Sequence, residues 1–308
     1  MSVWEHISMF AGLPVREFTI DTDDPAQPET VAWRVATDYD AGTAGFHRLW
    51  ENLLSRPWAS RVRAVVIGDW GESYERNAPI AELAAAADRL TGLRALFVGE
   101  MTSEESEISW IRQSDVTPLL RAYPGLEVLR VRGSAGLSLS PVRHDNLREL
   151  ALESGGLPAH VIAGVVACEL PELRHLELWL GTEEYGGDAT ADDLTPVLTG
   201  SGWPKLEYLG LRDAEIADEV AVALAAAPVV ARLSTMDLSL GLLSDVGAAG
   251  LLTGQPLIHL RRLDLHHHFL SDAMQARLRA ELEPFGVELD LSEAQDADDE
   301  ERFIAVSE

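Results

Sequence analysis

The chain repeats one short pattern of leucines, and this repetition restricts its fold more than any other feature. The pattern L-x-x-L-x-L, with valine or methionine in some places, starts at Leu93, Leu126, Leu147, Leu173, Leu206, Leu233 and Leu260. An earlier copy starts at Val62, and a half-copy lies at Leu289 and Leu291. The six intervals from Leu93 to Leu260 average about 28 residues, a period typical of proteins built from stacked repeats.

The spacing inside each copy indicates a short strand. Side chains alternate between the two faces of a strand, so the fourth and sixth positions point to one face and the residues between them to the other. One copy cannot bury its leucines alone, and neighbouring copies must therefore stack. We expect parallel strands in chain order, with the residues between the leucines forming one continuous inner wall.

The segment after each strand carries a helix-start signal. Three successive copies have an apolar residue, a small residue and an aspartate, at Ile216-Ala217-Asp218, Leu243-Ser244-Asp245 and Leu270-Ser271-Asp272. Serine can cap the free N–H groups of a helix, and an acid favours its positive end. The pattern predicts helices that begin near these aspartates and continue through residues 219–227, 246–252 and 273–282.

These strands and helix starts resemble leucine-rich repeats of the ribonuclease-inhibitor type over about residues 60–292. The resemblance implies an α/β solenoid, a right-handed horseshoe with parallel strands on the concave face and helices on the convex face. The opening GLPVREF and the later repeats are also similar to small bacterial leucine-rich-repeat proteins encoded beside radical-SAM and ATP-grasp proteins. One departure is that the asparagine or cysteine expected three residues after the third leucine is absent, so uniform curvature does not follow.

The ends of the chain differ from its middle. Residues 1–60 contain two expected strands, at 15–20 and 31–37, and an amphipathic helix around 46–54, which we interpret as an N-terminal capping segment. Residues 61–292 form the repeat domain, and residues 293–308 an acidic C-terminal tail, expected to be solvated. Long insertions at 100–115 and 181–193 predict loops on one rim, where repeat proteins often bind partners.

Charge and composition narrow the choice of partner. The 51 acidic and 24 basic residues leave a net charge of −27, which repels nucleic acid and anionic membrane surfaces. A basic protein or peptide fits this charge, although surplus acid also serves solubility alone. The N-terminus has no basic leader, and the uncharged stretches fall short of the ~18 residues of a membrane span. With Cys168 as the only cysteine, the sequence predicts a cytoplasmic protein without disulfides.

The inner wall offers candidate partner-binding residues. Aromatic and arginine side chains, which are enriched at interface hot spots, gather on its central strands. The candidates for partner binding are Arg130, Arg132, His175, Glu177, Trp179, Tyr208 and Arg212. The alternative is that any solenoid shows mixed polar residues on its inner face.

The run His266-His267-His268 raises the question of metal binding, since Asp264 lies on the same strand face as His266. Neighbouring histidines on a strand point to opposite sides, and His268 is expected in a solvated turn. No H-E-x-x-H pair supplies fixed ligands. We therefore expect no metal and no cofactor.

Catalytic motifs are missing from the sequence as well. There is no G-x-S-x-G, no phosphate-binding G-x-x-x-x-G-K and no zinc-type cysteine pair. Cys168 follows an apolar run, where a thiol packs as a small hydrophobe. The main hypothesis is a non-catalytic protein-protein interaction module that binds a protein or peptide through its concave face and long rim loops. The alternative is a metal-assisted enzyme that uses His175, Glu177 and the histidine and carboxylate cluster at 264–268.

Overall fold

The computed structural model describes residues 3–38, 40–297 and 301–307. These residues fall into two compact units. The first unit contains the described residues up to Glu153 together with Ala167–Leu170, and the second contains Ser154–Val166 and the described residues from Pro171 to Ser307.

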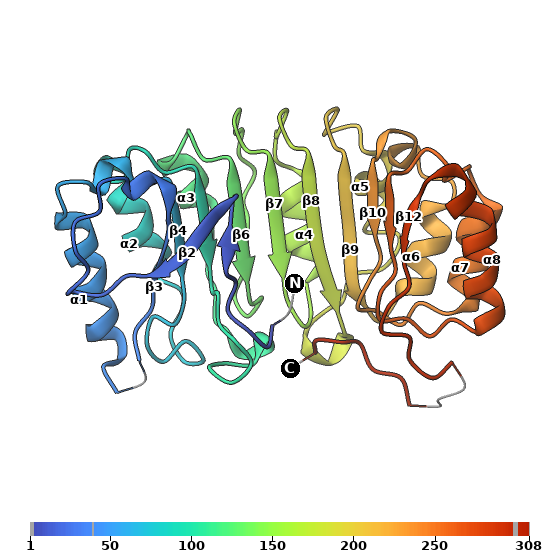
Figure 1. The fold of residues 1–308 in the computed structure, drawn as a ribbon, viewed down its shortest axis with the longest axis horizontal. Coiled ribbons are helices and arrows are strands. Elements are labelled where there is room, and N and C mark those ends of the chain that lie inside the picture. The colour runs from blue at the N-terminus through green and yellow to red at the C-terminus, as the bar shows by residue number, and fades with distance from the viewer. Residues whose placement is uncertain (1–2, 39, 298–300, 308) are drawn as a thin grey trace. The chain divides into compact units, whose positions relative to one another are not determined.

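The first unit is a sheet whose strands follow chain order (Figure 1). Its strands are β1 (Met9–Phe10), β2 (Leu13–Glu17), β3 (Ala32–Val35), β4 (Ala64–Ile67), β5 (Ala95–Val98), β6 (Val128–Arg132) and β7 (Glu149–Glu153). Strand β1 pairs antiparallel with β2, and all pairs from β2 to β7 are parallel. The helices are α1 (Gly42–Ser55), α2 (Ile80–Ala85) and α3 (Thr117–Ala122), with 3-10 turns η1 (Pro28–Thr30), η2 (Ala59–Arg61), η3 (Ala86–Asp88) and η4 (Ile108–Trp110). The parallel pairing thus already begins at β2 and β3, inside the expected capping segment.

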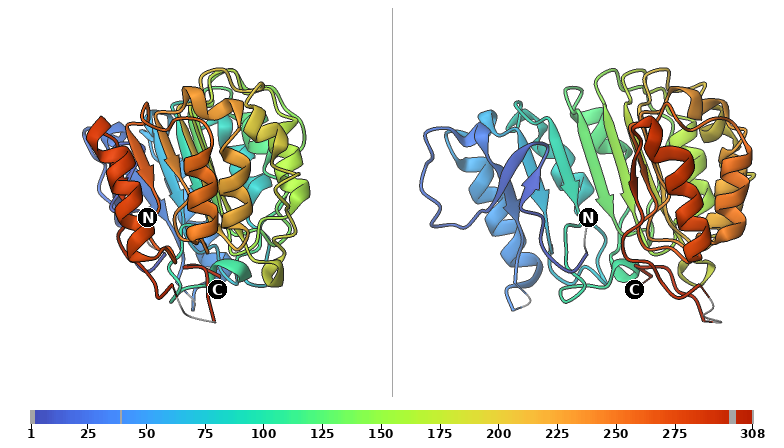
Figure 2. Two further views of the ribbon diagram at one scale, coloured as in Figure 1. Left: turned by 90° about the vertical axis from the view of Figure 1, so that its right-hand side faces the viewer. Right: turned by 45° about the vertical axis from the view of Figure 1, so that its right-hand side comes forward.

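The second unit repeats a strand and a helix along the chain. Its strands, all parallel to their neighbours, are β8 (His175–Gly181), β9 (Tyr208–Ala214), β10 (Thr235–Asp237), β11 (Arg262–Asp264) and β12 (Glu288–Asp290). The helices are α4 (Ala159–Val166), α5 (Thr195–Thr199), α6 (Ala217–Leu224), α7 (Asp245–Thr253) and α8 (Asp272–Leu282), with 3-10 turns η5 (Glu183–Tyr185), η6 (Pro228–Arg232) and η7 (Glu283–Phe285). Helices α6, α7 and α8 stand side by side in chain order (Figure 2).

The repeated leucines form the core, as their spacing predicted. Leu176 of β8 is in register with Leu209 of β9, which is in register with Met236 of β10, and all three are fully buried. Burial of each such side chain stabilises the fold by about 1.5–3 kcal/mol. The prediction of parallel strands stacked through their leucines is therefore confirmed within each unit.

The expected helix starts are also confirmed. Helices α7 and α8 begin at Asp245 and Asp272, and the Oγ atoms of Ser244 and Ser271 accept hydrogen bonds from the backbone of the first helical turn. The acids have a further role that the sequence did not reveal. Asp218 accepts a hydrogen bond of 2.5 Å from Ser244 Oγ, and Asp245 one of 2.7 Å from Ser271 Oγ. Each of these acids therefore connects its own helix to the start of the next helix.

The first residues of the chain cover part of the inner wall of the first unit. Phe10 packs on a cluster that includes Ala64, Ala95 and Phe97, and its ring centroid lies 5.9 Å from that of Phe97. Glu100, expected in a rim loop, is buried and accepts a hydrogen bond of 2.7 Å from Arg34 Nε. This part of the inner wall is therefore covered, because apolar residues near the N-terminus pack against its side chains.

The C-terminal tail is not solvated throughout. Ile304 and Val306 are each only 6% exposed, and Ala305 N donates a hydrogen bond of 2.8 Å to the carbonyl oxygen of Leu240. The expectation of a solvated tail is therefore wrong for residues 304–306, where apolar side chains follow the acidic run. Residues 298–300 and 308 lie outside the described part of the chain.

Candidate functional site

The side chains between the leucines of the second unit lie on one face of its strands, which we call the strand face. Strand register aligns them in two rows across β8 to β12. The first row contains His175, Tyr208, Thr235, Arg262 and Glu288, and the second contains Glu177, Gly210, Asp237, Asp264 and Asp290. The rows bring together histidine, tyrosine, arginine and carboxylate groups from five repeats.

An aromatic stack lies at one end of the first row. The rings of His175 and Tyr208 are 3.7 Å apart between centroids and inclined by 3°, and the Tyr208 hydroxyl donates a hydrogen bond of 2.7 Å to Asp237 Oδ2. Gly210 provides the space, since a Cβ there would lie 3.0 Å from that hydroxyl. Burial and the charge of Glu177 raise the pKa of Tyr208 well above its ordinary value, so the phenol stays a neutral donor.

A buried ion pair supports this stack. Glu177 Oε1 accepts hydrogen bonds of 2.8 Å from Arg212 Nη1 and 2.7 Å from Trp179 Nε1. Arg212 also lies over the Trp179 ring, at 5.1 Å from its centroid, and its Nε is 3.3 Å from Asp237 Oδ2. Burial alone lowers the pKa of Arg212, but the charges of Glu177 and Asp237 outweigh it, and the pKa lies above its ordinary value.

Five of the seven candidate residues therefore meet in one network of the second unit. These residues differ in solvent exposure. Glu177, Trp179 and Arg212 are 2%, 0% and 4% exposed, whereas the side chain of His175 is 24% exposed. In this arrangement the three buried residues support the partly exposed stack and are not themselves open to a partner. Alternation along a strand predicts the face of each residue but not its pairing with the next strand.

The other two candidates, Arg130 and Arg132, lie in the first unit. Arg130 Nε contacts Glu149 Oε1 at 2.7 Å, and Arg132 Nε contacts Glu153 Oε2 at 2.8 Å. Both arginines are buried, and Arg132 also lies over the Phe97 ring. Their charges are thus balanced by acids of the neighbouring strand β7.

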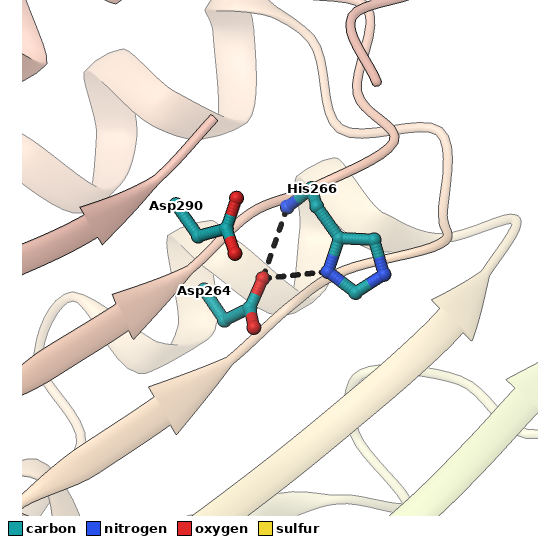
Figure 3. Close-up of side chains that lie close together, drawn as sticks. All are labelled: Asp264, His266 and Asp290. Carbon is teal, nitrogen blue, oxygen red and sulfur yellow. Dashed lines mark hydrogen bonds and ion pairs between the residues drawn. The ribbon is translucent and has the colours of Figure 1, made fainter. Parts of the chain in front are cut away.

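A third cluster lies on β11 and β12 (Figure 3). Asp264 Oδ1 lies 2.7 Å from His266 Nδ1, and Asp264 is in register with Asp290 on the next strand. Among the described residues, Asp264, His266 and Asp290 offer ligand atoms that all lie within 4.8 Å of one another. Arg262 Nη2, however, is 2.9 Å from an oxygen of each aspartate. The cluster has the donor set of a divalent metal, but a guanidinium already neutralises its acids.

The neighbouring histidines do not join this cluster. His268 is fully buried, its Nε2 lies 3.3 Å from the carbonyl oxygen of Leu291, and burial lowers its pKa. The expectation of a solvated turn at His268 is therefore wrong, because the side chain fills space inside the repeat. His267 bonds instead to the carbonyl oxygen of Phe303 near the end of the chain.

A short repeated motif in the sequence marks the aspartates of the second row. The second-row aspartates occur in M-D-L-S, L-D-L-H and L-D-L-S, starting at residues 236, 263 and 289. Each carboxylate accepts a hydrogen bond from the backbone N–H two residues later, at 3.0 Å in Asp237 and 3.1 Å in Asp264 and Asp290. The motif therefore closes the end of each strand and keeps the acid on the strand face.

No family model and no curated protein matches the chain. A crystal structure of a protein from Bacteroides fragilis matches with a TM-score of 0.78 and 30% identity, covering 88% of this chain and 76% of that one. The chain belongs to the family of this protein. The parallel strand and helix repeats give the family member described here a leucine-rich-repeat-like fold.

An internalin from Listeria monocytogenes also matches, over 89% of this chain and 73% of that one, with 15% identity and a TM-score of 0.29. Similarity at that level supports no inference. Within the described ranges of the chain, no helix is both long enough and apolar enough to span a membrane.

Proposed function

We propose that this protein is a non-catalytic interaction module that binds a protein or peptide partner on the strand face of its second unit. The observation that carries the proposal is the stack of His175 on Tyr208, which is partly exposed and rests on buried, paired groups. Aromatic groups held rigidly in this way lose little entropy on binding and are typical centres of binding energy.

Exposed acids at the edges of the strand face support a basic partner. Glu288 and Asp290 at the end of the rows have exposed fractions of 65% and 29%, and Arg262 is the cation that faces them. The loop after β8 adds the exposed acids Glu183 and Glu184. One arginine or lysine of a partner could stack on the aromatic pair, while other basic side chains of the same partner pair with these acids. The same surplus of acid disfavours nucleic acid and membrane surfaces.

Capture of the partner from the native host, followed by mass spectrometry, tests the proposal. His175→Ala should weaken capture at least tenfold, because a hot-spot side chain contributes more than ~1.4 kcal/mol. His47→Ala is the matched control, since His47 is an exposed histidine paired with one acid, Glu82, in the first unit. Unchanged capture by His175→Ala and by Tyr208→Phe would contradict the proposal.

We also assign the repeats to the ribonuclease-inhibitor type with its right-handed horseshoe, on the strength of the leucine pattern and the capped helix starts. Small-angle scattering of the whole chain would test the horseshoe. A cytoplasmic location is part of the proposal too, supported by the single cysteine, Cys168, which allows no internal disulfide and is buried. Reactivity of that thiol in the native protein would argue against an inert packing role.

One observation favours a second candidate, a metal-assisted enzyme, because Asp264, His266 and Asp290 converge. Arg262 competes for the same oxygens. Metal analysis of the purified protein, with His266→Ala and Arg262→Ala, separates the two functions. Stoichiometric metal that disappears in His266→Ala and binds more tightly in Arg262→Ala would favour the enzyme.

A further inference from the structure

Three residues at the ends of consecutive strands share an uncommon backbone conformation. Asp213, Leu240 and His267 have φ values of +50°, +71° and +56°. Each lies two residues after the third leucine of its copy, and each is 27 residues from the next. Residues other than glycine rarely adopt positive φ. The same turn therefore recurs in each repeat, at the carboxyl ends of β9, β10 and β11. We call these three residues the left-handed row.

The end of the chain lies across this row. His267 Nε2 lies 3.3 Å from the Phe303 carbonyl oxygen, and Ala305 N donates a hydrogen bond of 2.8 Å to the Leu240 carbonyl oxygen. Val306 N then donates one of 3.0 Å to Asp213 Oδ1. In Figure 1 this dark-red segment passes below the strands of the second unit.

The spacing of these contacts fits an extended peptide. The three steps of extended chain from residue 303 to residue 306 span about 10 Å, and the two steps between three neighbouring strands span about 9.6 Å. Residues 303–306 therefore meet the end of one repeat after another, in the order β11, β10, β9. At each strand end the segment is contacted through its own backbone atoms, so these contacts do not depend on which side chains the segment carries.

Two buried apolar side chains of the crossing segment and one buried acid of the row make the row selective for the segment that it binds. Ile304 and Val306, which alternate along the segment, are both buried. Asp213 is fully buried, and its Oδ2 has no hydrogen-bond partner among the described residues. Burial raises the pKa of Asp213, and the backbone amides of Val306 and Ala305 oppose this rise. The carboxyl group thus depends on N–H donors from the segment that crosses it.

We propose that the left-handed row is a second docking site, which takes an extended segment of a partner protein with apolar side chains at alternate positions. In the unbound protein, residues 303–306 occupy this site as a tethered ligand. The site lies at the strand ends and is separate from the stack of His175 and Tyr208, so it goes beyond the proposed function. Because a tethered segment competes at an effective concentration of roughly millimolar, a partner with a better-matched segment can displace it.

A labelled peptide with the sequence of residues 302–307, RFIAVS, tests the proposal by fluorescence anisotropy with the full chain. The double variant Ile304→Asp/Val306→Asp cannot dock its own tail. It should bind the peptide at least tenfold more tightly than the unaltered protein does. Adding Asp213→Ala to the double variant should weaken binding at least tenfold. A control peptide with aspartate at both apolar positions should not bind.

Equal binding of both peptides, or no binding to the double variant, would overturn the proposal. Light scattering could instead detect dimers of the unaltered protein that exchange their tails. Such dimers would also overturn the proposal, because the row would then bind a second copy of the chain. If the double variant does not fold, hydrogen exchange of the unaltered protein provides the test. Excess peptide should then accelerate exchange at the amides of Ala305 and Val306, and an unchanged rate would refute the inference.

Discussion

Removal of the Glu177 carboxylate tests whether the buried network holds the strand face. In Glu177→Leu, Arg212 Nη1 loses a partner at 2.8 Å and Trp179 Nε1 one at 2.7 Å. Leaving a buried charge uncompensated costs about 3–5 kcal/mol. Arg212 keeps a contact of 3.3 Å to Asp237, so we expect the lower end of this range, about 3 kcal/mol.

Urea unfolding followed by circular dichroism measures this cost as a lower midpoint with an unchanged slope. The double variant Glu177→Leu/Arg212→Met should recover only part of the loss, because the buried Asp237 keeps its hydrogen bonds from the hydroxyls of Tyr208 and Ser239 but loses its contact with Arg212. Glu172→Leu is the matched control, since Glu172 pairs with Lys205 at the surface, where an ion pair contributes at most about 1 kcal/mol. If Glu177→Leu costs no more than Glu172→Leu, the reasoning about the network is refuted.

Three further variants probe the repeat. Gly210→Ala places a Cβ 3.0 Å from the Tyr208 hydroxyl and should cost about 1–3 kcal/mol while weakening the near-ultraviolet signal of the stack; an unchanged spectrum would contradict this. The raised pKa of Asp213 means that protonation stabilises the fold, so stability is full below the ordinary pKa of aspartate and falls as pH rises through the folded value. Asp213→Asn should remove this fall in melting temperature with pH, and an identical profile would count against it. Ser271→Ala removes the cap of α8 and the bond to Asp245, and should cost about 1–2 kcal/mol in urea unfolding; no loss would show that water replaces both bonds.

The order of the strands and the starts of the helices could be predicted from the sequence. The leucines at 176, 209 and 263 are each two residues from another buried leucine of the same copy. Because side chains alternate between the two faces of a strand, both leucines of each pair must lie on the same face. The serine caps at 244 and 271 act on backbone groups two and three residues away, so their effect is likewise local. Such interactions are recognisable because the residues that make them are neighbours in the sequence.

The exposure of the candidate residues depended on contacts that only the tertiary structure shows. Arg212 and Trp179 look like open binding residues until Glu177, which is 35 positions from Arg212, pairs with them and both become buried. Ile304 and Val306 follow an acidic run that suggests solvent, yet both are buried, and the left-handed row, more than 35 residues earlier, binds the backbone of residues 303, 305 and 306. The leucine pattern determines which face a side chain takes, whereas the neighbouring strand, a full repeat away, determines whether that side chain stays open to a partner.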